Sequence, residues 1–198
     1  MSFHKTNQSL ADSLELIIKG CIGENRNSQA KLYNLYSRKM LGICLWYARN
    51  KEEAEEILQD GFLRVFKYIR TFKGTGSFEG WMRATMVSAA LSKYRSKSAK
   101  LRPVIEFNEA DHDIRQEATF VYDYDEKELL KLIQSLSPAY RLVFNLYVFE
   151  GMKHRQIAEL LTISEGTSKS NLADARAILR KALFEKKSSH LTKYSAYG

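Results

Sequence analysis

The sequence predicts an all-α protein with two small helical domains joined by a flexible acidic linker. Three observations support this fold class. Apolar residues recur at spacings of three and four, as on one face of a helix, while the alternation typical of strands is scarce. The 198 residues include only two prolines, Pro103 and Pro138, so few helices are interrupted. Carboxylates crowd residues 104–128, which separate two basic parts of the chain.

Three helices are expected in the first part of the chain. Residues 10–22 and 30–50 each carry an apolar face, and a turn with glycine separates them. The polar N-terminus before them is expected to fray. A third helix should cover residues 51–70, because Asn50 is a suitable N-cap and Glu53 follows three residues later, as in a capping box.

Carboxylates crowd the opening turns of this third helix. They are Glu52, Glu53, Glu55 and Glu56. Negative charge near a helix N-terminus offsets the positive end of the helix dipole, and this alone would explain them. The same residues would also form an acidic docking face for the basic surface of a partner, and both explanations stay open.

A loop with two glycines, residues 71–78, precedes a helix that is rich in cations. Gly74 and Gly76 interrupt the helical pattern, and aromatic side chains stand near the ends of the loop. The cations that follow are Arg83, Lys93, Arg95, Lys97, Lys100 and Arg102. Aromatic rings stack on bases and cations follow phosphates, so this combination suits single-stranded nucleic acid. The rings can instead anchor the core, and for Trp81 the core role is favoured.

The charge reverses after Pro103. Residues 104–128 hold nine carboxylates and two cations, which cannot bury much apolar surface, so an extended linker is expected. This linker is either a solvated spacer or, with equal support, an RNA mimic that occupies a basic channel.

A helix-turn-helix is expected near the C-terminus. Ser137 and Pro138 are a typical helix start, and the helix over residues 139–150 should end at Gly151. A short helix over residues 153–161 and a brief break come next. Ser164 is then the N-cap of a second helix. The apolar stripe of that helix is Leu172, Ala175, Leu179 and Ala182.

The second of these helices also has a polar outer face. Its first turns carry Thr167, Lys169, Ser170 and Asn171. In a helix-turn-helix the early residues of the second helix meet base edges in the major groove of DNA. Side chains of these types suit base edges or phosphates. An ordinary helical hairpin with a solvated polar face is the alternative.

Composition narrows the class of function. The formal net charge of +8 favours a polyanionic partner such as nucleic acid. Cys21 and Cys44 lie far apart, so two buried thiols are expected rather than a disulfide framework or a metal site. The longest apolar run is too short for a membrane span or a signal peptide, so a cytoplasmic protein without membrane insertion is expected.

No catalytic chemistry is expected. The histidines, which are His4, His112, His154 and His190, sit apart, and no nucleophile–base or metal-ligand spacing occurs. The sequence therefore predicts a protein that is not an enzyme and that has no cofactor and no metal. His154 is interpreted as a surface residue of the helix-turn-helix.

Three segments carry a family resemblance. Residues 53–67 read EAEEILQDGFLRVFK, and residues 77–82 read SFEGWM. The third segment joins LSPAYRLVF at residues 136–144 with EGMKHRQIAELL at 150–161 and ISEGTSKS at 163–170. In this order and spacing they resemble an extracytoplasmic-function (ECF) sigma factor of bacterial RNA polymerase. The GTSKS run resembles the versions found in Bacteroidetes-type bacteria.

The resemblance implies a division into four parts. Residues 10–100 would be sigma region 2, 101–125 the linker, 126–184 sigma region 4 and 185–198 a tail. Such a factor directs core polymerase to specific promoters and helps to open the −10 region. The implied partners are the clamp of the largest polymerase subunit, the flap of the second subunit, and promoter DNA as duplex and single strand. An anti-sigma protein is a further candidate partner.

The resemblance also implies three sets of site residues. The set that binds core polymerase is Glu53, Glu56, Gln59, Asp60 and Arg64. The set that binds −10 DNA is Phe72, Lys73, Phe78, Trp81, Arg83, Ser88, Lys93 and Arg95. The set that binds −35 DNA is Ser164, Thr167, Lys169, Ser170, Asn171 and Arg176.

The sequence departs from the family pattern at several positions. Thr162 stands where the turn usually has glycine, and Ser88 stands where asparagine is common on the −10 helix. Asn171 and Asp174 stand where basic residues are frequent on the recognition helix. These departures leave the fold intact and the promoter sequence open. Two rivals remain: a stand-alone helix-turn-helix regulator that binds duplex operators as a dimer, and a helical adaptor that binds only protein.

Overall fold

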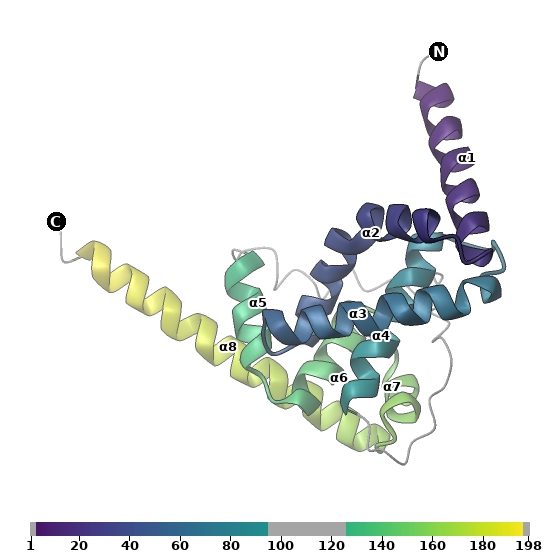
Figure 1. Cartoon of the computed structure of the whole chain (residues 1–198). Coiled ribbons are helices and arrows are strands. Elements are labelled where there is room, and N and C mark those ends of the chain that lie inside the picture. Colours follow the sequence, from purple (N-terminus) through teal and green to yellow (C-terminus); the bar gives the residue numbers. More distant parts are fainter. Residues whose placement is uncertain (1–2, 95–125, 196–198) are drawn as a thin grey trace. The chain divides into compact units, whose positions relative to one another are not determined.

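The computed structural model describes residues 3–94 and 126–195, with side chains described within 13–94 and 127–185. Every element in these ranges is a helix, as the sequence predicts (Figure 1). The helices are α1 (Phe3–Ile22), α2 (Arg26–Tyr47), α3 (Lys51–Tyr68), the short 3₁₀ helix η1 (Ile69–Thr71), α4 (Phe78–Tyr94), α5 (Glu126–Ser135), α6 (Pro138–Val148), α7 (His154–Leu161) and α8 (Glu165–Ser195). The predicted linker over residues 101–125 lies outside the described residues.

The chain forms two compact units. The first contains most of α1 to α4, and the second contains α5 to α8 together with Trp46–Asn50. Each unit has its own buried apolar residues, so each is considered by itself.

The first two helices begin earlier than the sequence predicts. The first helix starts at Phe3, within the stretch expected to fray, and α2 starts at Arg26 rather than near residue 30. The reason for the second difference is a cap: the side-chain oxygen of Asn25 accepts the backbone N–H of Ser28 at 3.0 Å. The C-terminal end of α1 is held as well, because Arg70 donates to the carbonyl of Ile22 at 3.0 Å.

The core of the first unit lies where α2, α3 and α4 meet. Its buried apolar members include Leu32, Met40, Ile57, Phe62, Val65, Met82, Met86 and Leu91. Gly61 of α3 faces Met86 of α4. A Cβ placed there would lie 2.2 Å from the sulfur of Met86, a separation that real Cβ atoms do not show. A side chain at position 61 would therefore displace the end of the Met86 side chain.

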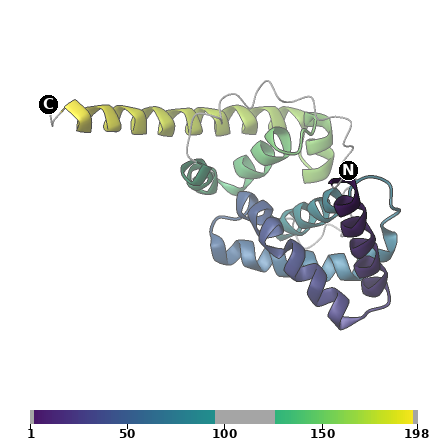
Figure 2. The same ribbon diagram turned by 90° about the horizontal axis from the view of Figure 1, so that it is seen from above.

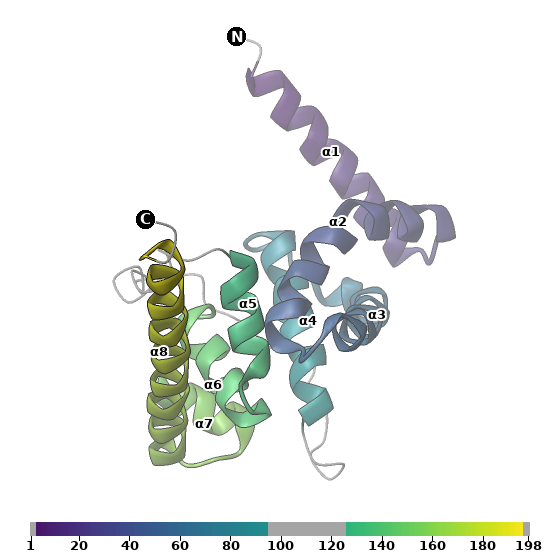
Figure 3. The same cartoon turned by 90° about the vertical axis from the view of Figure 1, so that its left-hand side faces the viewer.

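The second unit packs α6 and α7 against the first half of α8 (Figure 3). Its buried apolar members include Leu129, Ile133, Val143, Leu146, Ile157, Leu172, Ala175, Leu179 and Leu183. Most of the predicted stripe of α8 is thus in the core. Pro138 is the first residue of α6, as expected, while the side chain of Ser137 makes no capping hydrogen bond.

The last helix is longer than the sequence analysis expects. Residues 185–198 are predicted to form a tail, yet α8 continues as one helix to Ser195 (Figure 2). Its polar and basic composition indicates a surface segment but does not end a helix. Because no glycine or proline occurs between Thr167 and Ser195, nothing in that stretch interrupts the backbone hydrogen bonds.

Candidate nucleic-acid and protein interfaces

The turn between α7 and α8 has the geometry that its sequence predicts. Ser164 caps α8, because its Oγ accepts the backbone N–H of Thr167 at 2.9 Å. The backbone N–H of Ile163 closes the end of α7 on the carbonyl of Ala158 at 3.0 Å. Thr162 adopts the left-handed conformation, with φ 58° and ψ 46°. A residue with a side chain therefore occupies a position that favours glycine.

The outer face of α8 presents most of the predicted −35 residues. Ser164, Thr167, Lys169 and Ser170 are exposed, and Asn171 is half-buried. Lys169 pairs with Glu165 one turn earlier at 2.8 Å, with both side chains largely exposed. An exposed pair of this kind contributes only about 0–1 kcal/mol, so DNA phosphates can compete with it. The contacts of these residues with DNA stay a prediction.

A polar and aromatic cluster ties together the three helices of the second unit. The rings of His154 in α7 and Tyr147 in α6 stack at 4.8 Å between centroids. The guanidinium of Arg176 in α8 lies 5.4 Å from the centroid of Tyr147. Nδ1 of His154 lies 3.0 Å from the Oγ of Ser168, which is fully buried. These contacts fix the angle at which α8 leaves the turn.

His154 is therefore more than a surface residue of the helix-turn-helix. It is half-buried, and burial lowers the pKa of its imidazole, with the positive charge of Lys169 acting in the same direction. The sequence gives no direct signal for this role, because Ser168 lies fourteen residues away and the two meet only when α7 and α8 pack. Arg176, predicted to lie near phosphate, is half-buried beside this cluster.

Three aromatic rings gather where the loop after η1 meets α4. Phe72 lies 5.1 Å from Phe78 and 5.9 Å from Trp81, and Phe78 stacks on Trp81 at 5.7 Å with an interplanar angle of 23°. Phe78 is 6% exposed and forms the floor of this aromatic cluster. Phe72 and Trp81 are half-buried. The packing of Trp81 on Phe72 and Phe78 is consistent with the core role that the sequence favours, while its partial exposure keeps a role in strand binding open as a prediction.

The loop itself is shaped by its glycines. Gly74 and Gly76 have φ values of 72° and 79°, in the left-handed region where a side chain is disfavoured. The hydroxyl of Ser77 accepts the backbone N–H of Gly80 at 3.3 Å and so starts α4. Lys73 is exposed at the side of this loop.

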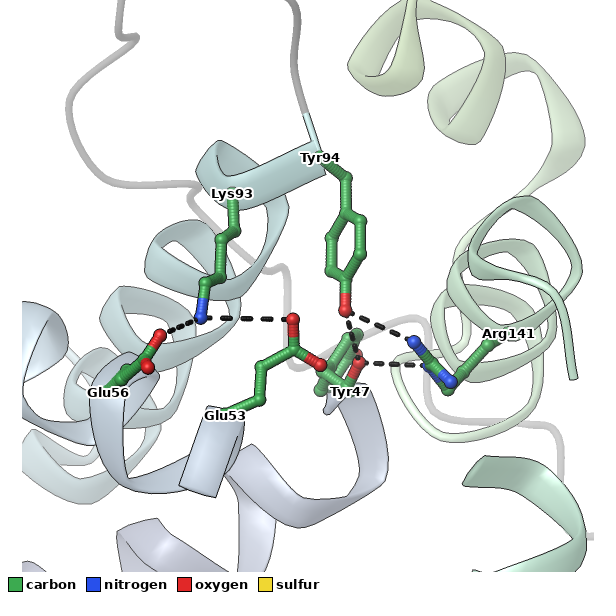
Figure 4. Close-up of polar contacts among 6 residues, drawn as sticks. All are labelled: Tyr47, Glu53, Glu56, Lys93, Tyr94 and Arg141. Atoms are coloured by element: carbon green, nitrogen blue, oxygen red, sulfur yellow. Dashed lines mark hydrogen bonds and ion pairs between the residues drawn. The ribbon is translucent and has the colours of Figure 1, made fainter. Parts of the chain in front are cut away.

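The predicted −10 residues along α4 do not all face solvent. Arg83 is half-buried, and Ser88 is 6% exposed. The guanidinium of Arg64 lies 3.4 Å from the carbonyl oxygen of Ser88, so this part of α4 faces α3 rather than an open surface. Lys93 is directed at two carboxylates of α3 (Figure 4). Arg95 lies outside the described residues.

The predicted polymerase-binding set on α3 divides between two faces. Glu56, Gln59 and Asp60 are exposed. Glu53 is only 9% exposed, and Arg64 is half-buried against α4. The exposed face also contains Leu63, which is 67% exposed and was not predicted as a site residue. Its spacing of seven from Glu56 places both on one side of the helix, a signal that the sequence already contained.

Two family models match the chain in the order of the two units. The Sigma-70 region 2 model matches residues 32–100, and the Sigma-70, region 4 model matches residues 126–179. The chain belongs to the sigma-70 family. It is an RNA polymerase sigma factor of the ECF group, a DNA-binding protein of transcription initiation.

This sigma factor is similar to sigma factors of several bacteria. It is 25% identical to the RNA polymerase sigma-H factor of Pseudomonas aeruginosa over 158 residues, which are 75% of this chain and 82% of that protein. It is 24% identical to the ECF RNA polymerase sigma factor SigW of Bacillus subtilis over 86% of this chain and 98% of SigW. It is 23% identical to the ECF RNA polymerase sigma-E factor of Haemophilus influenzae over 75% of this chain and 86% of that protein.

A solved structure, that of CnrH in complex with the cytosolic domain of CnrY, aligns with 86% of this sigma factor and 96% of that chain at 14% identity and a TM-score of 0.44.

Two structural findings complete the description of the sites. Within the described side chains, no group of three or more His, Cys, Asp or Glu residues is placed to hold a metal ion. None of the described helices is both long and apolar enough to span a membrane.

Proposed function

We propose that this sigma factor directs core polymerase to specific promoters through three surfaces and helps to open the −10 region. The observation that carries the proposal is that an acidic helix, an aromatic cluster beside a basic helix, and a capped helix-turn-helix occur in one chain in the order of sigma regions 2 and 4. The first surface is the exposed face of α3, with Glu56, Gln59 and Asp60. It docks on the clamp of the largest polymerase subunit, and Leu63 supplies apolar contact area there.

The second surface captures the −10 strand. Phe72 and Trp81 are half-buried and pack beside buried Phe78, and a base turned out of the duplex stacks against their exposed part. Unstacking one base costs a few kcal/mol, which such stacking can offset. Lys73 and Arg83 lie beside this cluster and neutralise the strand phosphates. Ser88 does not touch DNA. Its hydroxyl accepts a hydrogen bond from Arg64 of α3 and so helps to position α4.

The third surface reads the −35 element as duplex. The first turns of α8 enter the major groove, with Thr167, Lys169, Ser170 and Asn171 nearest the bases. Arg176 lies further along the helix, towards the phosphates. The contacts of His154 with Tyr147 and Ser168 keep this helix at a fixed angle to α6 and α7, so that its first turns enter the groove together.

The remaining features of the proposal follow from the family. Region 4 also contacts the flap of the second polymerase subunit, and an anti-sigma protein competes for the same surfaces. The acidic linker joins the two regions along the path of the RNA. The protein works in the cytoplasm, where its polymerase is, and needs no catalytic group, cofactor or metal of its own. The GTSKS run supports an origin in Bacteroidetes-type bacteria.

Run-off transcription tests the proposal. Core polymerase is reconstituted with this chain and given genomic promoter fragments that the holoenzyme selects. Specific transcripts that start at a defined site, and that disappear when the −10 or the −35 element is scrambled, are the expected result. A chain that binds promoter duplex alone but never joins core polymerase would instead establish a stand-alone regulator and overturn the proposal.

A further inference from the structure

The aromatic cluster at the start of α4 has a fourth ring, which comes from α2. The ring of Tyr36 lies 6.1 Å from that of Phe78 between centroids, with an interplanar angle of 66°. Three residues further along α2, the ammonium of Lys39 pairs with the carboxylate of Glu79 at 2.5 Å. Residues three apart are neighbours on a helix surface, so one side of α2 packs on the first turn of α4.

The hydroxyl of Tyr36 lies at the polar edge of this contact. Tyr36 is half-buried, and burial raises the pKa of its phenol; the negative charge of Glu79 adds to this rise, and the positive charge of Lys39 opposes it. Both charges act on the phenol because its oxygen lies near them. The side chains of Lys39 and Glu79 are 62% and 40% exposed. The ring of Tyr36 therefore joins the cluster, while its hydroxyl stands at a charged rim that faces solvent.

Stacking on the cluster does not by itself distinguish one base from another. Every base has a π-face, so stacking is tolerant of sequence, whereas hydrogen bonds to base edges read it. Phe72 and Phe78 have no polar side-chain atom, and the indole N–H of Trp81 can only donate. The hydroxyl of Tyr36 can both donate and accept. Among the four rings, Tyr36 is therefore the one that suits either kind of group on a base edge.

The charge of α2 suits the backbone of a strand as well. The helix carries no carboxylate and four exposed cations, which are Arg26, Lys31, Arg38 and Lys39. The pair of Lys39 with Glu79 is open to solvent, and exposed pairs of this kind contribute little to stability. A strand phosphate can therefore compete with Glu79 for the ammonium of Lys39.

We propose that α2 supplies a specificity-determining contact to the −10 strand: the Tyr36 hydroxyl hydrogen-bonds the edge of a base held at the aromatic cluster, and Lys39 binds a neighbouring phosphate. This inference rests on the proposed function, because it takes the cluster as the place where the strand is held. The loop and α4 hold the base, and α2 distinguishes which base it is.

The first arm of the test uses the full chain. Fluorescence anisotropy measures its affinity for labelled oligomers of dA, dC or dT, each of about 12 nucleotides, and the chain should prefer one of the three. Tyr36→Phe keeps the ring and removes only the hydroxyl. It should lower the affinity for the preferred oligomer about two- to tenfold, the effect of losing one hydrogen bond, and change the other two affinities less. A role in packing or stacking alone would leave the differences between the oligomers as they are.

Two matched controls accompany these variants. Tyr33→Phe removes the same hydroxyl from the same helix, where the ring packs on Phe62 of α3 at 4.6 Å, and it should leave all three affinities unchanged. Lys39→Gln should make the dependence of log K on log salt concentration shallower by about 0.7, the value for one phosphate contact on a single strand. Lys19→Gln breaks a similarly exposed pair on α1 and should leave this dependence unchanged.

Four outcomes of this arm would overturn the inference. They are an equal loss for all three oligomers in Tyr36→Phe, the same loss in Tyr33→Phe, equal salt dependence in the two lysine variants, and no strand binding by the unsubstituted chain. Thermal unfolding followed by circular dichroism confirms that the variants are folded.

The second arm uses the holoenzyme on promoter fragments that it selects, with each position of the −10 element substituted in turn. At one position Tyr36→Phe should reduce the differences in transcript yield between bases, while Tyr33→Phe should not. Unaltered base preferences at every position, with transcription intact, would overturn the inference and leave the proposed function standing. If no holoenzyme forms, the proposed function fails, whereas the first arm still decides whether Tyr36 reads a base.

Discussion

Replacing Thr162 with glycine should stabilise the second unit. The residue is exposed and adopts φ 58° and ψ 46° between α7 and α8. A left-handed backbone costs a residue with a side chain about 1–2 kcal/mol. Glycine removes that cost, but it loses more backbone entropy on folding, which takes back about 0.5–1 kcal/mol. The expected net gain is about 0.5–1 kcal/mol in the free energy of unfolding.

The assay must report on the second unit alone. Urea unfolding followed by the amide signals of α7 and α8 in NMR spectra meets this requirement, and thermal unfolding should shift upward by about 2–8 °C for a unit of this size. Thr162→Ala is the matched control, because alanine also carries a Cβ and should stay within about 0.5 kcal/mol of the original. If Thr162→Gly is no more stable than Thr162→Ala, the assigned backbone strain is refuted.

Four further predictions concern the individual surfaces. Asp60→Arg should weaken binding to core polymerase about tenfold or more through charge repulsion, while Glu15→Arg on α1 should not. If the two variants bind core polymerase with equal affinity in a titration, docking through α3 is contradicted. Trp81→Ala should cost strand binding about 1–3 kcal/mol, the contribution of stacking on one base, and Trp81→Phe should restore most of it; the same loss in both variants would exclude stacking. Lys169→Ala should reduce the salt dependence of duplex binding by about 0.9 in slope, with Lys181→Ala as control, and an unchanged slope would remove Lys169 from the interface. The pKa of His154 is lowered in the folded chain, so near this pKa the folded state binds fewer protons than the unfolded state. The free energy of unfolding of the second unit should therefore fall as the pH decreases through about 6.5. His154→Gln should remove this dependence, and a pH profile that stays the same in the variant would exclude His154 as its source.

The sequence is most informative where local rules decide the structure. Ser164 could be identified as an N-cap because its hydroxyl serves an amide only three residues away. Gly74 and Gly76 likewise marked a loop that needs positive φ values. The short helix α7 and the stripe of α8 followed from spacing alone, which is why the helix-turn-helix was predicted nearly residue by residue.

Tertiary contacts between helices were not available from the same rules. The sequence places Lys93 on a basic helix and Glu53 and Glu56 on an acidic one, but their pairing depends on how α3 and α4 cross. Ser88 was assigned to DNA by its position on α4, whereas packing turns it towards Arg64. The continuation of α8 past residue 185 could have been predicted, because the absence of glycine and proline was already visible.

The near contact of Gly61 with Met86 has a mechanical consequence. With no side chain at position 61, the side chain of Met86 packs directly against the backbone of α3, and such close packing transmits strain. We therefore expect the two helices to move together when a partner binds one of them. A partner that binds to α3 would in this way also affect the position of the aromatic rings at the start of α4.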